Sequence, residues 1–394
     1  MLVLSIAMTV LSVLVCLVWG SRHFQISREK RLGESLTDRS PGAPPEPPRV
    51  TMVVAAKDEE ANIGPCLRSL LAQDYPNFEL IACEDRSTDR TGAILDALSA
   101  EEDRLRVIHV KELPAGWCGK NNAMRTGIVA AAGAPWLCMS DADCRFLSPR
   151  MLSAAVRYAV DNSVDMLSVL PALEMRGFWE NVVQPICAGL MMIWFRPDKV
   201  NDPARPNAYA NGAFMLIRRT AYEAAGGHEA VKDQVNEDMH MAARVKSAGL
   251  RLRVIRNEGL YQSRMYTSLG AIVRGWSRIF FGTFGTLRRL TASMAVLCTM
   301  SVYPYLSAAL GLALAAAGVQ PAAAWWTCGV AGAAAVLSQL SVIWRFYAFA
   351  GARPALTWAY LAGVVVTAVA LVGSFRKLRP GAQVVWRSTT YTKT

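Results

Sequence analysis

Charge is distributed very unevenly along this chain of 394 residues, and that distribution limits what the chain can fold into. The first segment, MLVLSIAMTVLSVLVCLVWG (1–20), carries no charge, and residues 294–371 carry only Arg345 and Arg353. A run of about 20 apolar residues is long enough to cross a bilayer as a helix. The sequence therefore predicts a globular middle part framed by membrane segments.

We expect six parts along the chain, with boundaries set by these changes in composition. They are a transmembrane anchor at 1–20, a linker at 21–48 that is rich in Pro, Ser and Gly from Ser35 on, a globular domain at 49–270, an amphipathic interface segment at 271–290, transmembrane helices at 291–373 and a basic cytoplasmic tail at 374–394.

The N-terminal segment is interpreted as an uncleaved anchor. A cleaved signal peptide is the alternative, but it favours a basic start and a small-residue cleavage site. Here the start is uncharged, and the segment ends in Val-Trp-Gly-Ser-Arg. Four basic residues follow within eleven positions of Gly20, so the positive-inside rule predicts that the globular domain is cytoplasmic. They are Arg22, Arg28, Lys30 and Arg31. With the apolar C-terminal segments, the expected location is the cell membrane, as a multi-pass protein.

The C-terminal segments pose a counting problem. Three spans are expected, at 294–319, 325–344 and 355–371, and they would leave the C-terminus outside. The basic tail from Arg376 onward indicates instead that the C-terminus is inside. We give the tail charge more weight, so one candidate is expected to lie in the interface or re-enter, and residues 272–290 are predicted to form an in-plane helix.

The formal net charge of +11 raises the question of a nucleic-acid partner. No nucleic-acid-binding module is recognisable, and the basic residues gather toward the membrane boundaries, where the anionic leaflet attracts them. We therefore expect no nucleic acid as partner. The nine cysteines form no CxxC pair, so we expect buried thiols in a reducing compartment and no zinc site.

Strand-like and helix-like segments alternate across the globular domain. Strands are predicted at 49–56, 78–83, 105–110 and 136–140, and helices at 62–72, 87–100 and 120–132. Nearly continuous apolar strands separated by helices indicate a mainly parallel sheet covered on both faces. Ligands bind to such sheets beyond the carboxyl ends of the strands.

Acidic residues follow three of these strands, at the edge where a ligand is expected. They are Asp58, Glu59 and Glu60, then Glu84 and Asp85, then Asp141 and Asp143. In the stretch WLCMSDADCR, side chains two positions apart would point the same way if the strand continued to its tip. Two like charges that close repel unless a cation lies between them. The alternative is a turn that merely contains two aspartates.

Other segments supply further candidates, each with a plainer alternative. Asp85 is expected to accept hydrogen bonds from a base or ribose, whereas Asp89 fits that role and helix capping about equally. Lys120 opens a helix in GWCGKNNA, where it would neutralise phosphate unless it is a solvated surface lysine. Glu237 and Asp238 lie in a first helical turn, where the helix dipole favours acids in any case.

The segment RGWSR precedes the apolar C-terminal region. Its Arg274 and Arg278 are candidates for holding a leaving diphosphate, and Trp276 for stacking on a sugar. A juxtamembrane helix with an aromatic belt is the alternative for Trp276.

Taken together and in order, residues 50–281 resemble the family 2 glycosyltransferases of the GT-A fold. Within that family, the chain is most similar to membrane-bound enzymes that act on lipids, such as ceramide glucosyltransferases and carotenoid- or hopanoid-associated glycosyltransferases. The motifs that carry the resemblance are VVAAKDEEANIGPCLRSLLAQDYPNFELIACEDRSTDRT, DAD, NGAFMLIRRTAYEAAGGHE and NEDMHMAARVKSAGLRL. The resemblance implies an α/β, Rossmann-like domain with a mainly parallel sheet, flanked by transmembrane helices.

The resemblance also implies roles for residues. Asp141 and Asp143 would bind Mg²⁺ or Mn²⁺ as the DxD motif, and Asp238, beside Glu237, would be the general base. The segment from Arg274 departs from the family's Q/R-x-x-R-W motif, because Arg278 is followed by Ile279. The implied nucleotide-sugar site comprises Ala56, Lys57, Asp58, Glu59, Asp85, Lys120, Asp141, Ala142, Asp143, Arg274, Trp276 and Arg278, and the implied acceptor side comprises Gly226, Gly227 and His228.

The implied activity is metal-dependent, inverting transfer of a sugar from a nucleotide-sugar such as a UDP-hexose to a lipid acceptor. A processive polysaccharide synthase is the first alternative, although this chain has few spans for a channel. A non-catalytic membrane scaffold or transporter is the second, but it gives no reason for acids at three strand ends.

Overall fold

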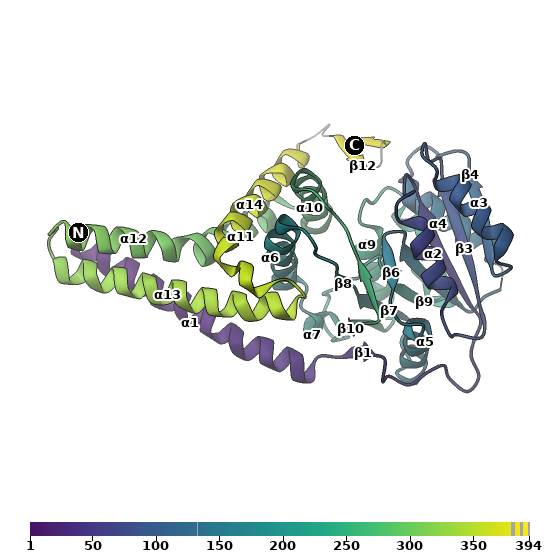
Figure 1. Cartoon of the computed structure of the whole chain (residues 1–394), viewed down its shortest axis with the longest axis horizontal. Helices are drawn as coiled ribbons and strands as arrows, with labels where there is room; N and C mark the ends of the chain where they lie inside the picture. The colour runs from purple at the N-terminus through teal and green to yellow at the C-terminus, as the bar shows by residue number, and fades with distance from the viewer. Residues whose placement is uncertain (132, 380–382, 387–388, 393–394) are drawn as a thin grey trace. The chain divides into compact units, whose positions relative to one another are not determined.

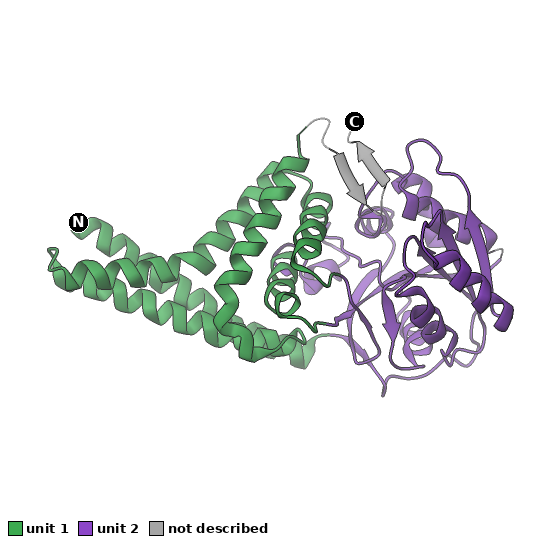
Figure 2. Cartoon of the chain, turned by 45° about the horizontal axis from the view of Figure 1, so that its top comes forward, with its two compact units in different colours: residues 1–33, 175–191, 266–382 green, residues 34–174, 192–265, 383–394 purple. Residues whose placement is uncertain are grey.

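The computed structural model describes residues 1–131, 133–379, 383–386 and 389–392. The chain divides into two compact units, each described here by itself (Figure 1, Figure 2). A helical unit comprises Met1–Gly33, Met175–Met191 and Tyr266–Ala382. An α/β unit comprises Glu34–Glu174, Met192–Met265 and Gln383–Thr394.

The α/β unit is built on an eight-stranded sheet within the described residues, with the strand order β1-β10-β7-β9-β5-β2-β3-β4. Every pairing in it is parallel except the two made by β9. The strands are β1 (Ser35–Thr37), β2 (Val50–Ala56), β3 (Phe78–Asp85), β4 (Leu105–Val110), β5 (Trp136–Asp141), β7 (Met166–Leu170), β9 (Met215–Arg218) and β10 (Leu252–Glu258).

Helices cover both faces of this sheet. Neighbouring residues of its central strands point to opposite sides, so each of these strands contributes apolar side chains to two buried clusters. Met52 and Val54 belong to one buried cluster, with Leu67 of α2 and Leu95 of α3. Val53 belongs to the other cluster, which includes residues of α4 and α9. The helices are α2 (Ile63–Leu71), α3 (Thr91–Glu101), α4 (Gly119–Ala130), α5 (Met151–Asp161), α7 (Pro197–Val200), α8 (Arg219–Ala224), the 3₁₀ turn η1 (His228–Val231) and α9 (Glu237–Ser247).

A small second sheet follows the carboxyl end of β5. It has the order β6-β11-β8, formed by β6 (Cys144–Phe146), β8 (Ala172–Leu173) and β11 (Tyr261–Ser263). It therefore brings a late segment of the unit beside the DAD stretch, which connects β5 to β6.

The four predicted strands are all present, and so is the predicted mainly parallel sheet with helices on both faces. The helix expected from residue 87 begins only at Thr91, because hydrogen bonds described below hold the preceding residues in a loop. The segment expected to be a linker is partly regular, since α1 continues to Leu32 and β1 pairs with β10.

The helical unit contains long apolar helices joined by short turns. Its elements are α1 (Leu2–Leu32), α6 (Phe178–Trp194, whose last residues belong to the other unit), α10 (Leu269–Phe284), α11 (Leu287–Leu297), the π-helical turn η2 (Cys298–Val302), α12 (Tyr303–Ala316), α13 (Ala322–Phe349), the 3₁₀ helix η3 (Pro354–Ala359) and α14 (Tyr360–Lys377). Small residues let α12 and α13 approach closely: a Cβ placed on Gly311 would lie 2.4 Å from the backbone nitrogen of Gly329.

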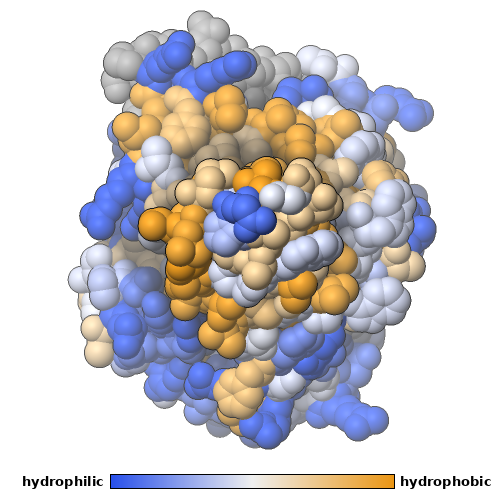
Figure 3. All heavy atoms as spheres, turned by 90° about the vertical axis from the view of Figure 1, so that its left-hand side faces the viewer, coloured by the Kyte–Doolittle hydropathy of each residue, from blue (hydrophilic) through white to orange (hydrophobic). Residues whose placement is uncertain are grey.

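Four helical stretches among the described residues are long and apolar enough to cross a membrane. They are Leu2–Leu32, Leu287–Ala316, Ala322–Phe349 and Pro354–Lys377. Large apolar side chains are exposed along them, for example Leu306, Val330 and Leu337, each more than 60% exposed. Figure 3, a view from the end that carries the N-terminus, shows apolar side chains gathered over this surface.

The segment expected to be one in-plane helix over residues 272–290 is two helices instead. α10 ends at Phe284, because Gly285 adopts a left-handed conformation (φ 62°), and α11 begins at Leu287. The sequence analysis also did not identify α6 as part of the helical unit. The preceding Glu174 belongs to the α/β unit.

Candidate active site

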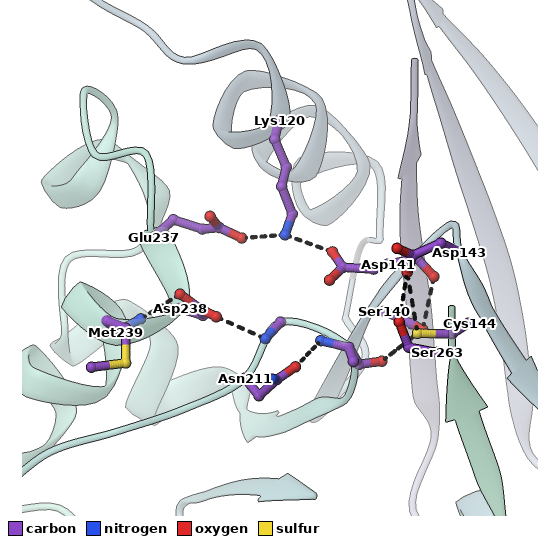
Figure 4. Close-up of polar contacts among 12 residues, drawn as sticks. Lys120, Ser140, Asp141, Asp143, Cys144, Asn211, Glu237, Asp238, Met239 and Ser263 are labelled. Carbon is purple, nitrogen blue, oxygen red and sulfur yellow. Dashed lines mark hydrogen bonds and ion pairs between the residues drawn. The ribbon is translucent and has the colours of Figure 1, made fainter. Parts of the chain in front are cut away.

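Lys120 lies between two carboxylates beyond the carboxyl end of β5 (Figure 4). Its Nζ is 2.6 Å from Asp141 Oδ1 and 2.6 Å from Glu237 Oε1. Burial acts to lower the pKa of Lys120, but Asp141, Glu237 and Asp238 outweigh it and hold that pKa well above its usual value. The ammonium group is therefore a permanent cation, and the alternative of a freely solvated lysine does not hold.

Asn121, the next residue, fixes the segment that leads into α9. Its Nδ2 donates hydrogen bonds to the backbone carbonyls of Val231, Lys232 and Gln234, over 2.7, 3.1 and 2.9 Å. These bonds position the start of α9, and with it Glu237, against the start of α4. Asn121 was not predicted from the sequence to have a role. The indication in the sequence was an asparagine inside the first turn of an expected helix, where Asn is an unfavourable residue.

Asp143 lies in the turn between β5 and β6, because β5 ends at Asp141. Strand alternation therefore does not account for the proximity of the two aspartates. Asp143 Oδ1 accepts a hydrogen bond from Ser263 Oγ of β11 over 3.2 Å. Burial, then the charges of Asp141 and Glu59, raise the pKa of Asp143 to about 7, although the Ser263 hydrogen bond opposes the shift.

Asp238 is held by two backbone groups in the first turn of α9. Its Oδ2 accepts from the N–H of Gly212 over 2.9 Å, and its Oδ1 accepts from the N–H of Met239 over 2.8 Å. Burial and the adjacent Glu237 raise the pKa of Asp238 to about 7, against the opposing effect of Lys120. A carboxylate poised near neutral pH suits proton transfer.

Gly212 leaves room for the ion pair at the centre of this cluster. A Cβ built on it would lie 3.0 Å from Lys120 Nζ and 3.4 Å from Asp141 Oδ2. The turn that carries it is closed by Asn211 Oδ1, which accepts from the N–H of Ala213 over 3.0 Å. The sequence analysis gave Gly212 no role, although its Asn-Gly pair is a turn signal.

Asp85 ends β3 and is 2% exposed. Its Oδ1 accepts from Arg86 Nε over 2.8 Å, while its Oδ2 has no hydrogen-bond partner among the described residues. A buried carboxylate oxygen without a partner is costly unless a ligand donates to it. Asp85 is thus available to a donor group of a bound molecule.

The loop after β2 is tied to the loop after β3. Asp58 Oδ1 accepts from the N–H of Thr88 over 2.8 Å, and the N–H of Glu60 donates to Asp89 Oδ2 over 3.0 Å. Asp89 Oδ1 also accepts from the N–H of Thr91, over 2.9 Å. For Asp89 these bonds favour the capping alternative, and they explain why α3 begins at Thr91.

Three other residues of the predicted nucleotide-sugar site flank these acids. Ala56 is the buried last residue of β2, and the half-buried Lys57 follows it. Ala142 is buried between the two aspartates of the DAD stretch. All three lie at the carboxyl end of the sheet.

The predicted acceptor residues form a tight turn before η1. Gly226 and Gly227 have φ of 83° and 55°, and a Cβ on Gly227 would lie 2.8 Å from the Tyr222 ring. The Tyr222 hydroxyl is 2.9 Å from His228 Nδ1. Burial, with the charge of Lys120, lowers the pKa of His228 to about 3, so this ring is a neutral hydrogen-bonding group.

Arg274, Trp276 and Arg278 lie on α10 of the helical unit. Trp276 is 5% exposed and packs on Phe280, with ring centroids 5.4 Å apart. Arg278 Nη2 donates to the Tyr266 hydroxyl over 3.2 Å. The structure therefore gathers these three in a unit different from that of Lys120, and their part in the site stays a prediction.

The acids of the α/β unit fit a divalent cation by their charge. No three His, Cys, Asp or Glu side chains of the described residues already converge as a metal cluster. However, Asp143 is beside Asp141 and Glu59, and this concentration of negative charge raises its pKa. Carboxylates are the ligands that Mg²⁺ and Mn²⁺ favour, so Asp141 and Asp143 are suitable to hold one.

Residues 51–226 match the family model described as glycosyl transferase family 2. This match covers β2, β3 and the DAD stretch of the site above. This part of the chain is similar to glycosyltransferase family 2.

Curated proteins similar to this chain include glycosyltransferases. The chain is 25% identical over 266 residues to 4,4'-diaponeurosporenoate glycosyltransferase of Staphylococcus aureus strain MRSA252, covering 67% of this chain and 69% of that protein. The same enzyme of strain USA300 is 24% identical over the same length.

A solved structure shows that the fold is GT-A. The mannosyltransferase PcManGT of Pyrobaculum calidifontis, in complex with GDP-Man and Mn²⁺, matches with a TM-score of 0.51. It is 19% identical, and the match covers 84% of this chain and 99% of the mannosyltransferase. The expected GT-A fold is confirmed.

Proposed function

We propose that this chain is a family 2 glycosyltransferase that moves a hexose from a nucleotide-sugar, such as a UDP-hexose, to a lipid acceptor at the cytoplasmic membrane face. The proposed transfer depends on a metal ion and inverts the anomeric carbon. The observation that carries the proposal is the cluster of Lys120, Asp141, Glu237 and Asp238 at the carboxyl end of the sheet.

The donor side is assigned to the acids at the strand ends and to Lys120. Asp85 accepts hydrogen bonds from the base or ribose through its unpartnered Oδ2. Asp141 and Asp143 would hold Mg²⁺ or Mn²⁺, which supplies positive charge against the diphosphate. Lys120 adds a fixed cation beside Asp141. Placing cations where negative charge develops on the leaving group lowers the barrier to departure.

The acceptor side is assigned to Asp238. Its Oδ2 and Oδ1 are oriented by the backbone N–H groups of Gly212 and Met239. In its ionised form the carboxylate takes the proton from the acceptor hydroxyl as that oxygen bonds to the anomeric carbon and the nucleoside diphosphate leaves. A single displacement inverts the anomeric centre, so no carboxylate nucleophile is required.

A lipid acceptor is supported by the chain's own helices and by its relatives. Four stretches are apolar and long enough to span a membrane. The S. aureus relative is named for diaponeurosporenoate. The basic flank of α1, with Lys30 and Arg31 in its last turn, supports a cytoplasmic α/β unit.

The test is a donor assay in membranes that contain the full chain. Membranes are incubated with radiolabelled UDP-glucose or GDP-mannose and Mn²⁺, and are then extracted with organic solvent. Label in short lipid products supports the proposal. Label in long polymer favours a processive synthase, and an absence of turnover with every nucleotide-sugar in folded protein favours a non-catalytic scaffold.

Asp238→Asn separates the base assignment from donor binding. This variant is expected to lose transfer about 10²–10⁴-fold, as general-base variants do, while UDP binding stays nearly unchanged. Asp233→Asn, an exposed acid five positions earlier in the chain, is the matched control and is expected to keep full activity. Retention of most activity by Asp238→Asn would show that the base is another group.

A further inference from the structure

The helical unit contains an apolar groove that the proposed function does not use. It has a volume of about 540 Å³ and lies among α10, η2 and α14. Its walls include Val273, Cys298, Val302, Val369 and Val372. A volume of this size is typical of sites for drug-sized or lipid-like ligands.

The groove is shaped by the backbone and by fixed contacts at one end. Its wall at η2 is a π-helical turn, a departure from α-helix that is frequent at functional sites. At the end near Ser277, Ser374 Oγ donates to the Ser277 carbonyl over 2.8 Å, and Lys377 Nζ donates to Ser277 Oγ over 2.7 Å. α10 and α14 are thereby clamped together beside the groove.

An unpaired cation lies at that same end. Arg376 lines the groove and is exposed, and no ion pair or hydrogen bond to its side chain is found within the described part of the chain. The sequence contains no Asp or Glu after Glu258. The helical unit has only Glu29 and Glu180, and the latter is 1% exposed and accepts from the N–H of Arg176 over 2.5 Å. The helices that line the groove therefore offer no acidic side chain to Arg376, and an anion bound there would come from another source.

The length of the groove matches one leaflet of a bilayer. From Val364 to Arg376 is twelve helical steps of α14, or about 18 Å at the rise of an α-helix. Half of a bilayer's hydrocarbon core is about 15 Å thick. An apolar chain that lies along Val364 and Val369 would thus place a head group at the level of Arg376.

We propose that this groove is a binding site for one anionic phospholipid of the bilayer, with an acyl chain along α14 and the phosphate on Arg376. The proposal does not depend on the sugar-transfer reaction. The matching length fits any phospholipid, and the charge of Arg376 favours one whose head group is negative overall over a zwitterionic one.

Cys298 provides a direct readout because it lines the groove and is exposed, whereas Cys16 is partly exposed and the other seven cysteines are buried. The full chain with Cys16→Ser is reconstituted in vesicles of phosphatidylcholine alone or with 30% phosphatidylglycerol, and labelling of Cys298 by N-ethylmaleimide is timed. We expect about tenfold slower labelling with phosphatidylglycerol, and that difference is expected to disappear in Arg376→Gln. Arg379→Gln, three positions on, is the matched control that keeps it.

A second variant fills the groove without removing charge. Ala368→Trp places a large ring on the groove wall and is expected to abolish the protection of Cys298 by phosphatidylglycerol, whereas Val330→Trp on the exposed surface of α13 is expected to retain it. Retention of donor-sugar binding by both variants would confirm that the protein is folded. Equal labelling rates in both vesicles for the wild type, or a difference that Arg376→Gln retains, would overturn the proposal.

Discussion

Lys120 Nζ lies 2.6 Å from Asp141 Oδ1, which joins the start of α4 to the end of β5 through one charge pair. The same nitrogen contacts Glu237 of α9, so three segments distant in sequence meet at a single ammonium group. This arrangement leads to separate predictions for stability, pH dependence, cation binding and the space around the pair.

Lys120→Met retains the length of the side chain but removes its charge. The carboxylates of Asp141 and Glu237 would then face each other without a cation. We expect the free energy of unfolding to fall by about 3 kcal/mol, the lower end for a broken buried pair, because Asp141 is one third exposed and solvent screens part of its charge. Denaturant unfolding checks this, with the exposed Lys111→Met as control. Equal losses in both variants would contradict the buried pairing.

The pKa of Asp238, about 7, predicts opposite pH trends for activity and stability. Activity requires the ionised base, so the transfer rate is expected to rise as pH increases through about 7. The folded-state pKa lies above the ordinary value of about 4, so the protonated form stabilises the fold, and this contribution is lost as pH rises toward 7. Comparing the wild type with Asp238→Asn from pH 5 to 9, by rates and by metal-free melting curves, isolates both effects. A pH-independent difference between the two proteins would disprove the assignment.

The pKa of Asp143, also about 7, makes cation binding depend on pH. Mn²⁺ requires the ionised carboxylate, so its affinity is expected to fall about tenfold for each pH unit below 7, with one proton released on binding. At 100 times the Kd, Mn²⁺ should stabilise the wild type by about 2.7 kcal/mol. EDTA should remove that gain, and Asp143→Asn should lack it. The exposed Asp74→Asn serves as control, and an unchanged response in Asp143→Asn would place the cation elsewhere.

Gly212→Ala tests the space beside the ion pair. The added Cβ would lie 3.0 Å from Lys120 Nζ, so the pair must shift to accommodate it. Because a displacement of about 1 Å can cost about 10²-fold in rate, we expect transfer to fall by 10- to 100-fold with little change in thermal stability. In Gly64→Ala, the control, the new Cβ meets only Ile94, at 3.6 Å. Comparable activity in the two variants would show that Gly212 is not near the reacting groups.

The sequence was most informative where side-chain periodicity determines the structure. The strand expected at 49–56 was predicted to within one residue because a buried parallel strand needs a continuous apolar run. The acids after such strands were found for the same reason, since the carboxyl edge of the sheet follows from strand direction alone.

The site contacts that were not predicted from the sequence are long-range hydrogen bonds. Asn121 holds carbonyls 110 to 113 positions further along the chain, and Ser263 reaches Asp143 across 120 positions. No local pattern encodes such partners, because either residue is equally compatible with a solvated loop. The roles of Gly212 and Asn121 therefore became visible only with the fold.

Most of α6 lies in residues 175–191 of the helical unit, between two stretches of the α/β unit in the sequence. Its Val182 carbonyl accepts from the Tyr347 hydroxyl over 3.1 Å, and a Cβ on Gly363 of α14 would lie 2.5 Å from that same carbonyl. A fragment cut before α10 would keep α6 but lose both of these neighbours, leaving its apolar surface bare. We therefore expect that removing the C-terminal helices is not enough to make the α/β unit soluble, and that residues 175–191 must be redesigned as well.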